Sequence, residues 1–327
     1  MKKKHEKSPC RKEKIWRFGN RRRQCSSCGK TWSVWKRKTG RRRVRITVKL
    51  ARALVLGRLL PVRSKRSGWP QTRNQRVYRL SLSRKKCATF CLWPTIPPGV
   101  PLIMIADALV KYVGKEWHTW YIMLVRPVNE DTAYVIPSYH EKGTETLSGW
   151  QRALKAVDGE IANRLKALVC DGHRGLVFGA RQRELILQRC HFHFIARIQS
   201  RRSKWKTGRH QNEGKRIYEL ARWILTEPDN FVLQPLINEL EEYSWTTTSE
   251  DLQKCLAGFV NHYQDFRSYL KHPELRLPAT SNSAEAIIGL IENVCRRARG
   301  FTSVKTTNEW IVSVLKIRKT IKCAPAK

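Results

Sequence analysis

Two aspartates of the sequence are placed where their carboxylates could hold a metal ion. Asp171 follows a short apolar run, residues 167–170, and is followed at once by Gly172, which predicts an acid at the end of a buried strand. Asp107 comes just after a second apolar run, residues 101–105. Strand ends collect ligands in α/β proteins because the strand fixes the side chain and the next loop leaves it accessible. For Asp171 alone, a turn aspartate before glycine is an equally good interpretation.

A third carboxylate comes from residues 280–285, Thr-Ser-Asn-Ser-Ala-Glu. Ser281 or Asn282 can cap a helix that has Glu285 in its first turn. Residues three and four apart share one side of a helix. On that side lie Glu285, Gly289, Glu292, Arg296 and Arg299. Glu292 is the competing acid, and a solvated face with capping acids is the alternative for the whole stripe.

Carboxylates held side by side repel each other unless a cation lies between them. Hard oxygen ligands in a phosphate-handling protein favour Mg²⁺, with Mn²⁺ as its substitute. Three acids complete a site for two metals about 3.5 to 4 Å apart, which activates a water or hydroxyl and stabilises the leaving oxygen of an in-line phosphoryl displacement.

The elements that must position these acids are predicted from the hydrophobic pattern. In order, the chain has strand-like runs at residues 101–105, 117–125 and 132–139, a helical pattern at 145–165, and the strand that ends at Asp171. Further helical segments follow. This order predicts an α/β fold in which helices flank a mixed sheet. If the first and fourth strands are neighbours, Asp107 and Asp171 converge.

The charge of the chain points to a polyanionic partner. The 327 residues contain 65 Lys and Arg against 26 Asp and Glu, a net charge of +39, and residues 1–100 hold 31 of the basic residues against Glu6 and Glu13. Nucleic acid is the leading partner and an anionic membrane surface the second. No apolar run of a membrane-spanning length and no signal peptide is found. Ten irregularly spaced cysteines favour a reducing, intracellular environment.

Cys25 and Cys28 form a Cys-x-x-Cys pair followed by glycine and lysine. Two thiolates at this spacing can hold one Zn²⁺ from a tight turn, as in a small zinc ribbon. Candidates for the other ligands are Cys10 and His5. The alternative is two ordinary thiols in a basic tail.

A basic helical region is predicted after the cysteine pair. Val48, Ala51, Leu54 and Val55 share one side of a helix, and a second helix is expected around residues 75–82, after a break at Gly68-Trp69-Pro70. A helix-turn-helix that enters the major groove and charged helices that only coat phosphates are equally compatible with this pattern.

Taken together, the motifs resemble a known family. They are Asp107, Asp171 in Cys-Asp-Gly-His-Arg-Gly, Cys190-His-Phe-His193 and Thr280-x-Asn-x-x-Glu285. This ordered set resembles DDE transposases of the Mutator-like group and their bacterial insertion-sequence relatives, over residues 100 to 315.

The resemblance implies a ribonuclease H-like core with a helical insertion, preceded by a zinc ribbon and helix-turn-helix region. It implies that Asp107, Asp171 and Glu285 bind the catalytic Mg²⁺ or Mn²⁺, and that Cys190 and His193 form the Cys-x-x-His element of the family. Arg174, Arg296 and Arg299 are candidate DNA contacts. The expected divisions are 1–43 zinc ribbon, 44–93 basic helical region, 94–100 linker, 101–194 first part of the core, 195–277 helical insertion, and 278–327 catalytic helix and tail.

The expected function is transposition: cleavage at element ends and transfer of the 3′-hydroxyl ends into target DNA. Expected partners are double-stranded DNA, both terminal inverted repeats and target, and further copies of the chain, with no membrane, in a cytoplasmic, nucleoid-associated protein. The alternatives are a catalytically inactive DNA-binding protein or repressor derived from a transposase, and a nuclease of the same fold.

Overall fold

The computed structural model describes most of the chain in two compact units. The described residues are 15–18, 22–29, 31–33, 47–56, 73–202, 211–247, 249–297 and 303–326. The first unit comprises Met1–Ile46 and the second Thr47–Lys327. Each unit is treated by itself.

The described part of the first unit is a small antiparallel sheet of three strands. They are β1 (Ile15–Phe18), β2 (Arg22–Cys25) and β3 (Thr31–Ser33). Cys25 ends β2 with a buried side chain, and Cys28 is exposed in the turn that follows. Gly29, at φ +68°, donates from its backbone N to the Cys25 carbonyl (3.0 Å). The other proposed zinc ligands, His5 and Cys10, lie outside the described residues.

The second unit is built on a mixed sheet of seven strands. Its order is β10-β6-β5-β4-β8-β9, with β7 paired to β5. Strands β4, β8 and β9 run parallel, and the other pairings are antiparallel. The strands are β4 (Leu102–Val113), β5 (Glu116–Pro127), β6 (Thr132–Val135), β7 (Tyr139–Lys142), β8 (Leu165–Cys170), β9 (Ile186–Arg189) and β10 (Thr320–Lys322).

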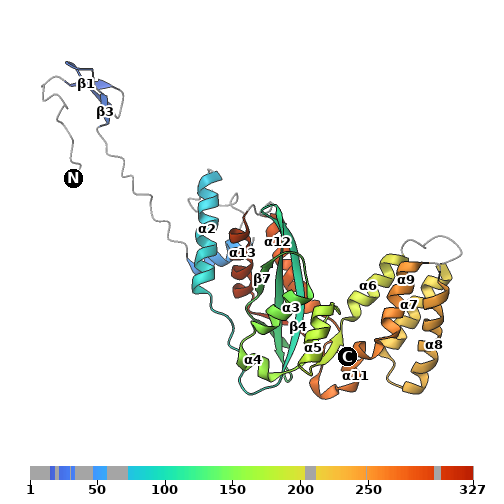
Figure 1. Cartoon of the computed structure of the whole chain (residues 1–327). Helices are drawn as coiled ribbons and strands as arrows, with labels where there is room; N and C mark the ends of the chain where they lie inside the picture. The colour runs from blue at the N-terminus through green and yellow to red at the C-terminus, as the bar shows by residue number, and fades with distance from the viewer. Residues whose placement is uncertain are drawn as a thin grey trace. The chain divides into compact units, whose positions relative to one another are not determined.

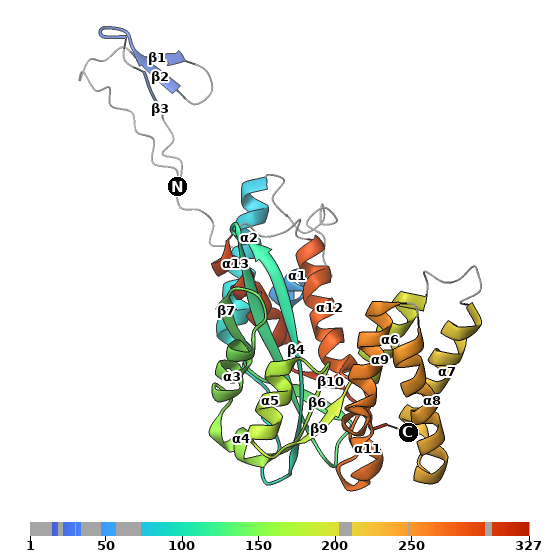
Figure 2. The same cartoon turned by 45° about the vertical axis from the view of Figure 1, so that its right-hand side comes forward.

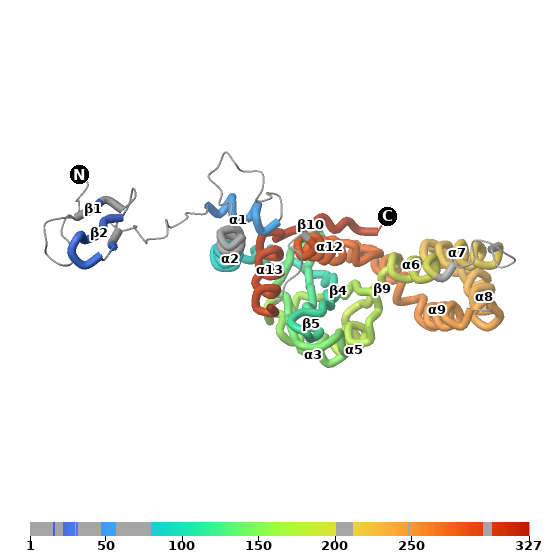
Figure 3. Tube along the Cα trace, turned by 90° about the horizontal axis from the view of Figure 1, so that it is seen from above, coloured from blue at the N-terminus to red at the C-terminus, as the bar shows by residue number. Residues whose placement is uncertain are grey.

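Helices cover both faces of this sheet, as the view from above shows (Figure 3). On one face lie α3 (Leu147–Lys155) and α5 (Arg174–Gln182), and on the other α12 (Asn282–Arg297) and α13 (Val304–Ile317). Trp150 of α3, fully buried, packs with Leu176 of α5 in the core on that face. The mixed α/β fold expected from the sequence is confirmed.

A group of helices with its own core lies beside the sheet (Figures 1 and 2). It comprises α6 (His191–Arg202), α7 (Gln211–Thr226), α8 (Asn230–Thr246) and α9 (Glu250–Val260). Phe194 of α6 stacks on Phe259 of α9, with ring centroids 4.0 Å apart. The short elements α10 (Tyr263–Phe266), α11 (Ser268–Lys271) and η3 (Pro273–Leu275) lead back to the sheet.

The two helices that precede the sheet in the chain, α1 (Val48–Val55) and α2 (Arg73–Phe90), pack against α13. Ala51, Leu54 and Val55 are buried on α1, as the spacing predicts. On α2, main-chain carbonyls accept hydrogen bonds from Ser313 and Lys316 of α13. The described part of the basic region is therefore attached to the sheet unit.

The structure differs from the sequence prediction at three elements. Asp107 does not end a strand, because β4 continues six residues beyond it to Val113, paired along its length with β5. The helix expected over 145–165 is divided into α3 and α4 (Gly159–Arg164), because the Asp158 side chain caps a new helix by accepting from the Glu160 amide (2.9 Å). The run 132–139 is divided between β6 and β7.

Among the described residues, no helix is both long and apolar enough to cross a bilayer.

Candidate active site

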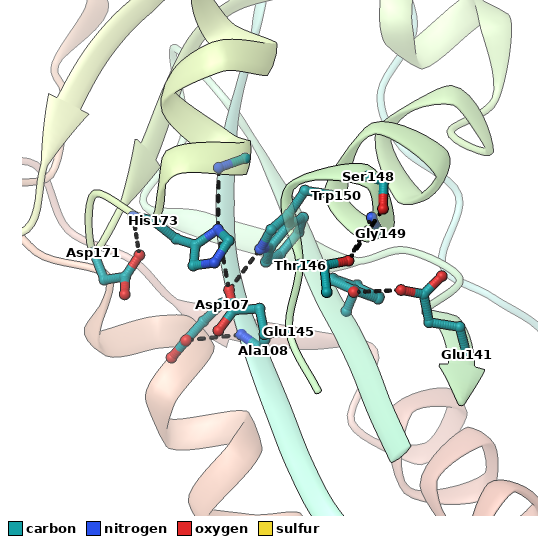
Figure 4. Close-up of polar contacts among 12 residues, drawn as sticks. Asp107, Ala108, Glu141, Glu145, Thr146, Ser148, Gly149, Trp150, Asp171 and His173 are labelled. Atoms are coloured by element: carbon teal, nitrogen blue, oxygen red, sulfur yellow. Dashed lines mark hydrogen bonds and ion pairs between the residues drawn. The ribbon is translucent and has the colours of Figure 1, made fainter. Parts of the chain in front are cut away.

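The strand pairing puts Asp107 and Asp171 at the same level of the sheet. β4 and β8 are parallel neighbours, and Ile105 is in register with Val169. Asp107 and Asp171 each come two residues later, so both side chains leave adjacent strands at one position. Figure 4 shows the two aspartates close together near the start of α5.

A tight turn after β8 fixes the Asp171 carboxylate. Its Oδ1 accepts a hydrogen bond from the His173 backbone N (2.8 Å). Gly172 between them has φ +92°, a left-handed conformation that disfavours other residues. A Cβ at Gly172 would also overlap the Arg189 guanidinium. Gly172 is thus needed both for the backbone conformation of the turn and for the close approach of Arg189.

Asp107 carries the electrostatic strain of the site. Burial, together with the negative charges of Asp171 and Glu285, raises the pKa of Asp107 to about 7, against the backbone hydrogen bond from Ala108 and the positive charge of His193. The Ala108 amide donates to Oδ1 at 2.8 Å. Asp171 and Glu285 are therefore close enough to Asp107 to oppose the ionisation of Asp107.

The first turn of α12 supplies Glu285. Ser281 precedes the helix, its carbonyl accepts from the Ala284 amide (2.8 Å), and its hydroxyl donates to Glu285 Oε1 (3.2 Å). His193 Nδ1 lies 3.5 Å from the same Oε1. The glutamate is held by the start of its own helix and by α6.

The Cys-x-x-His element lies between the strand that leads to Asp171 and the helix of Glu285. The Cys190 amide donates to the Cys170 carbonyl (2.7 Å), and the Cys190 thiol accepts from the Ser281 amide (3.2 Å). Sγ of Cys190, a ring nitrogen of His193 and a carboxylate oxygen of Glu285 lie within 4.8 Å of one another. The element therefore has a third potential metal ligand in Glu285, which the sequence prediction lacks.

Cys190 and His193 also alter each other's protonation. Burial alone would raise the pKa of Cys190, but hydrogen bonds with His193 and Ser281 lower it below its ordinary value. The same interaction with Cys190 raises the pKa of His193 to about 9, with smaller contributions from Glu285 and Asp107. A protonated His193 faces the acids and partly offsets their charge.

Glu145 is an acid near the site that the sequence analysis missed. Its Oε1 lies 3.7 Å from His173 Nδ1 and accepts from Trp150 Nε1 (2.6 Å), as Figure 4 shows. Burial raises the pKa of Glu145, and Asp171 adds to the effect. Glu145 lies in the turn before α3, and no motif in the sequence connects it with His173.

The remaining candidates lie on α5 and α12 or outside the described residues. Glu292 is the alternative to Glu285. Its Oε1 lies 3.6 Å from Nζ of Lys111, a residue of β4 that comes four residues after Asp107. Arg174 and Arg296 have exposed side chains on α5 and α12. Arg299 lies outside the described residues.

The donor set fits a divalent cation of the Mg²⁺ class. Asp107, Asp171 and Glu285 supply carboxylate oxygens, the ligands that Mg²⁺ and Mn²⁺ prefer. A partly buried acid whose pKa is raised to about 7 is stabilised as a carboxylate when a cation binds beside it. A bound cation would therefore offset the repulsion between Asp107 and its two neighbouring acids.

Comparison with known proteins supplies the family. Residues 103–288, more than half of the chain, match the family model of the Mutator family of transposases, and the matched segment contains Asp107, Asp171, Cys190, His193 and Glu285. No curated protein sequence matches the chain. Because the match covers more than half of its length, the chain belongs to the Mutator family of transposases, enzymes that process DNA.

Proposed function

We propose that this transposase cleaves DNA at the ends of its element and joins the resulting 3′-hydroxyl ends to target DNA, at a site formed by Asp107, Asp171 and Glu285. The observation that carries the proposal is the register of β4 and β8, in which Asp107 and Asp171 each follow a paired residue by two positions. The influence of the Asp171 and Glu285 charges on the pKa of Asp107 supports the inclusion of Glu285. The strand order β6-β5-β4-β8-β9, antiparallel then parallel, supports a ribonuclease H-like core with α6–α9 as its helical insertion.

The three carboxylates would hold Mg²⁺ or Mn²⁺, which when bound activates the attacking oxygen and stabilises the leaving oxygen. The side chains around them have separate roles. Ser281 and His193 orient Glu285 through Oε1. Cys190 fixes the start of α12 through the Ser281 amide, and so positions Glu285 without contacting the DNA.

Recognition of element ends is assigned to the basic residues before the sheet, including a Zn²⁺ site formed by Cys25 and Cys28 with Cys10 and His5 as the candidate further ligands. The support for this assignment is the Cys25–Cys28 turn at the end of β2 and the positive charge of the segment. Zinc content per chain, measured for wild type and Cys28→Ser, tests the metal site: loss of bound zinc in the variant is expected, and equal zinc content would contradict it.

The test of the reaction is Mg²⁺- or Mn²⁺-dependent cleavage and joining of DNA that carries the terminal repeats of the element. Asp171→Asn is expected to lower the rate by on the order of 10³-fold while binding DNA normally in Ca²⁺. Asp158→Asn is the matched control, because asparagine caps a helix as well as aspartate. Cleavage by Asp171→Asn at the wild-type rate would overturn the assignment, and would favour a nuclease site elsewhere or a contaminating activity.

The choice between the two glutamates has its own comparison. Glu285→Gln is expected to abolish cleavage. Glu292→Gln, which loses only a partly exposed pair with Lys111, is expected to retain cleavage within a few-fold. The reverse result would move the third ligand two turns along α12.

A further inference from the structure

We propose that a basic pocket beside Asp171 binds one unpaired nucleotide of the DNA strand next to the bond that is cleaved. The pocket lies between α5, α6, α9 and α10, has a volume of about 560 Å³, and includes Asp171 and Gly172 in its lining. The inference rests on the proposed function for its location, because only a strand at Asp171 would reach the pocket.

The charge of the lining favours a phosphate. Exposed basic side chains come from α5, α6 and α9, and Arg189 is added at the inner end. They are Arg174, Arg181, Arg189, Arg197 and Lys254, and the acids in the lining are Asp171 and Asp265. Lys254 forms an ion pair with Glu250 on the surface of α9, so its charge is partly offset. Arginine binds phosphate oxygens through two donors at once.

An exposed aromatic ring lies among these arginines. Phe178 is 45% exposed and lines the pocket. Arg174, Phe178 and Arg181 are spaced four and three residues apart on α5, so they share one side of the helix. A phenyl ring between two arginines provides a stacking surface for a base and contacts for the flanking phosphates, the combination used to bind single strands.

The size of the pocket selects an unpaired nucleotide over a duplex. Its volume lies within the range of about 300 to 1,000 Å³ in which proteins enclose one small ligand, which is enough for a nucleotide and far too little for paired strands. An enzyme that acts on a duplex can extrude a base at a cost of a few kcal/mol, and a stacking partner offsets that cost.

Arg189 connects this pocket to the Asp171 turn. Its guanidinium lies over the Phe266 ring, 4.7 Å from the centroid, and Gly172 leaves room for it. The Nε of Arg189 is buried and has no hydrogen-bond partner among the described residues. Arg189 is therefore the lining residue that lies against both the Gly172 turn and the Phe266 ring.

The first experiment is photocrosslinking of the full chain to an oligodeoxythymidine that carries one iododeoxyuridine, in EDTA, followed by peptide mapping. In the wild type we expect a crosslink at Phe178, in the tryptic peptide of residues 175–181. Phe178→Tyr should retain the crosslink and Phe178→Leu should lose it. Phe231→Leu is the control, because Phe231 is 88% exposed on α8 and is not in the pocket lining.

The second experiment tests the arginines by measuring the yield of the crosslink at Phe178 in charge-reversed variants. Arg181→Glu with Arg197→Glu is expected to lower that yield on the order of tenfold. The matched control is Lys155→Glu with Arg183→Glu, which makes the same change in charge around a separate hollow between α3 and α5. Equal losses in the two double variants would show a general effect of charge and would overturn the pocket.

The third experiment compares the single-stranded probe with duplex DNA of the same sequence. The proposal expects little crosslinking at Phe178 from a perfect duplex and restored crosslinking when the iodinated base is unpaired. Equal yields from both, or no crosslink at Phe178 from any probe, would contradict it. Because the assay needs no metal, its failure would leave the cleavage proposal intact. Cleavage that does not depend on Asp171 would leave the binding of an unpaired nucleotide intact, but would remove its placement next to the cleaved bond.

Discussion

Asp107 must be a carboxylate to bind a metal, but burial makes the ionised form of this side chain unfavourable for the stability of the metal-free protein. Burial and two neighbouring acids raise its pKa to about 7, so the folded, metal-free protein binds a proton that the unfolded chain releases at a much lower pH. The stability that this proton supplies is present in acid and is lost as the pH rises through about 7.

Asp107→Asn should therefore stabilise the metal-free protein at alkaline pH. We expect the variant to gain on the order of 2–4 kcal/mol over the wild type at about pH 8 and almost nothing at about pH 4, measured by thermal denaturation in EDTA. Saturating Mg²⁺ should narrow the difference, because the cation stabilises the wild-type carboxylate. A pH-independent difference would contradict the electrostatic account.

Gly172→Ala tests the close approach of Arg189. Strain from positive φ alone should destabilise by about 1 kcal/mol, as in Gly143→Ala, where φ is +109° and a Cβ meets nothing within 4 Å. Gly172→Ala must in addition displace the Arg189 guanidinium, so both its melting temperature and its cleavage rate should fall below those of Gly143→Ala. Equal behaviour of the two variants would show that Arg189 moves freely.

The three acids could be proposed from the sequence because their types and order form a motif. Glu145 was missed, since that residue reaches His173 only after α3 folds onto α5. Of the basic residues in the pocket, only Arg174 was a sequence candidate. Arg181, Arg197 and Lys254 were missed for a related reason: they come from three helices, and nothing in one sequence shows that these helices meet.

At the scale of elements, Arg126 ties the sheet to the segments that precede α12 and end the chain. The side chain is fully buried and donates to the carbonyls of Glu130 (3.2 Å), Leu275 (3.3 Å), Arg276 and Cys323 (3.5 Å). These carbonyls would lose their partner together if the guanidinium were removed.

Arg126→Met should lower the free energy of unfolding by about 3 kcal/mol in urea denaturation, because it leaves buried carbonyls unpaired. Arg152→Met is the control: its side chain is 53% exposed, and its partner Glu141 keeps a hydrogen bond from the Tyr121 hydroxyl (2.7 Å) when Arg152 is removed, so the expected loss is below about 1 kcal/mol. Similar losses in both variants would contradict a structural role for Arg126.

Most element types were predictable from hydrophobic pattern, and the errors have physical causes. An acid inside an apolar run suggests a strand end, yet β4 continues past Asp107 because residues 108–113 pair with β5. The division between α3 and α4 depends on one cap, Asp158. The pairing of β10 with β6 joins strands almost 190 residues apart in the chain, and no local signal predicts it.

At the scale of the whole molecule, charge is divided between the two units. Residues 1–46 contain 19 Lys and Arg against Glu6 and Glu13, a net +17, and the rest of the chain carries +22. Residues 47–327 should bind terminal-repeat DNA more weakly than the full chain. The affinity should also fall less steeply with salt concentration, because several fewer counterions are released from the DNA on binding. Unchanged affinity and slope across a salt titration would show that the first unit does not contact DNA.

The central claim is that Asp107, Asp171 and Glu285 share one metal site, and Fe²⁺ in place of Mg²⁺ tests it most directly. Hydroxyl radicals generated at bound Fe²⁺ cut the nearest main chain, and mapping the fragments locates the metal without any DNA substrate. We expect cuts around residues 107, 171 and 285, suppressed by excess Mg²⁺ and lost in Asp171→Asn. Cuts that spare residues 107 and 171, or that persist in Asp171→Asn, would contradict the account.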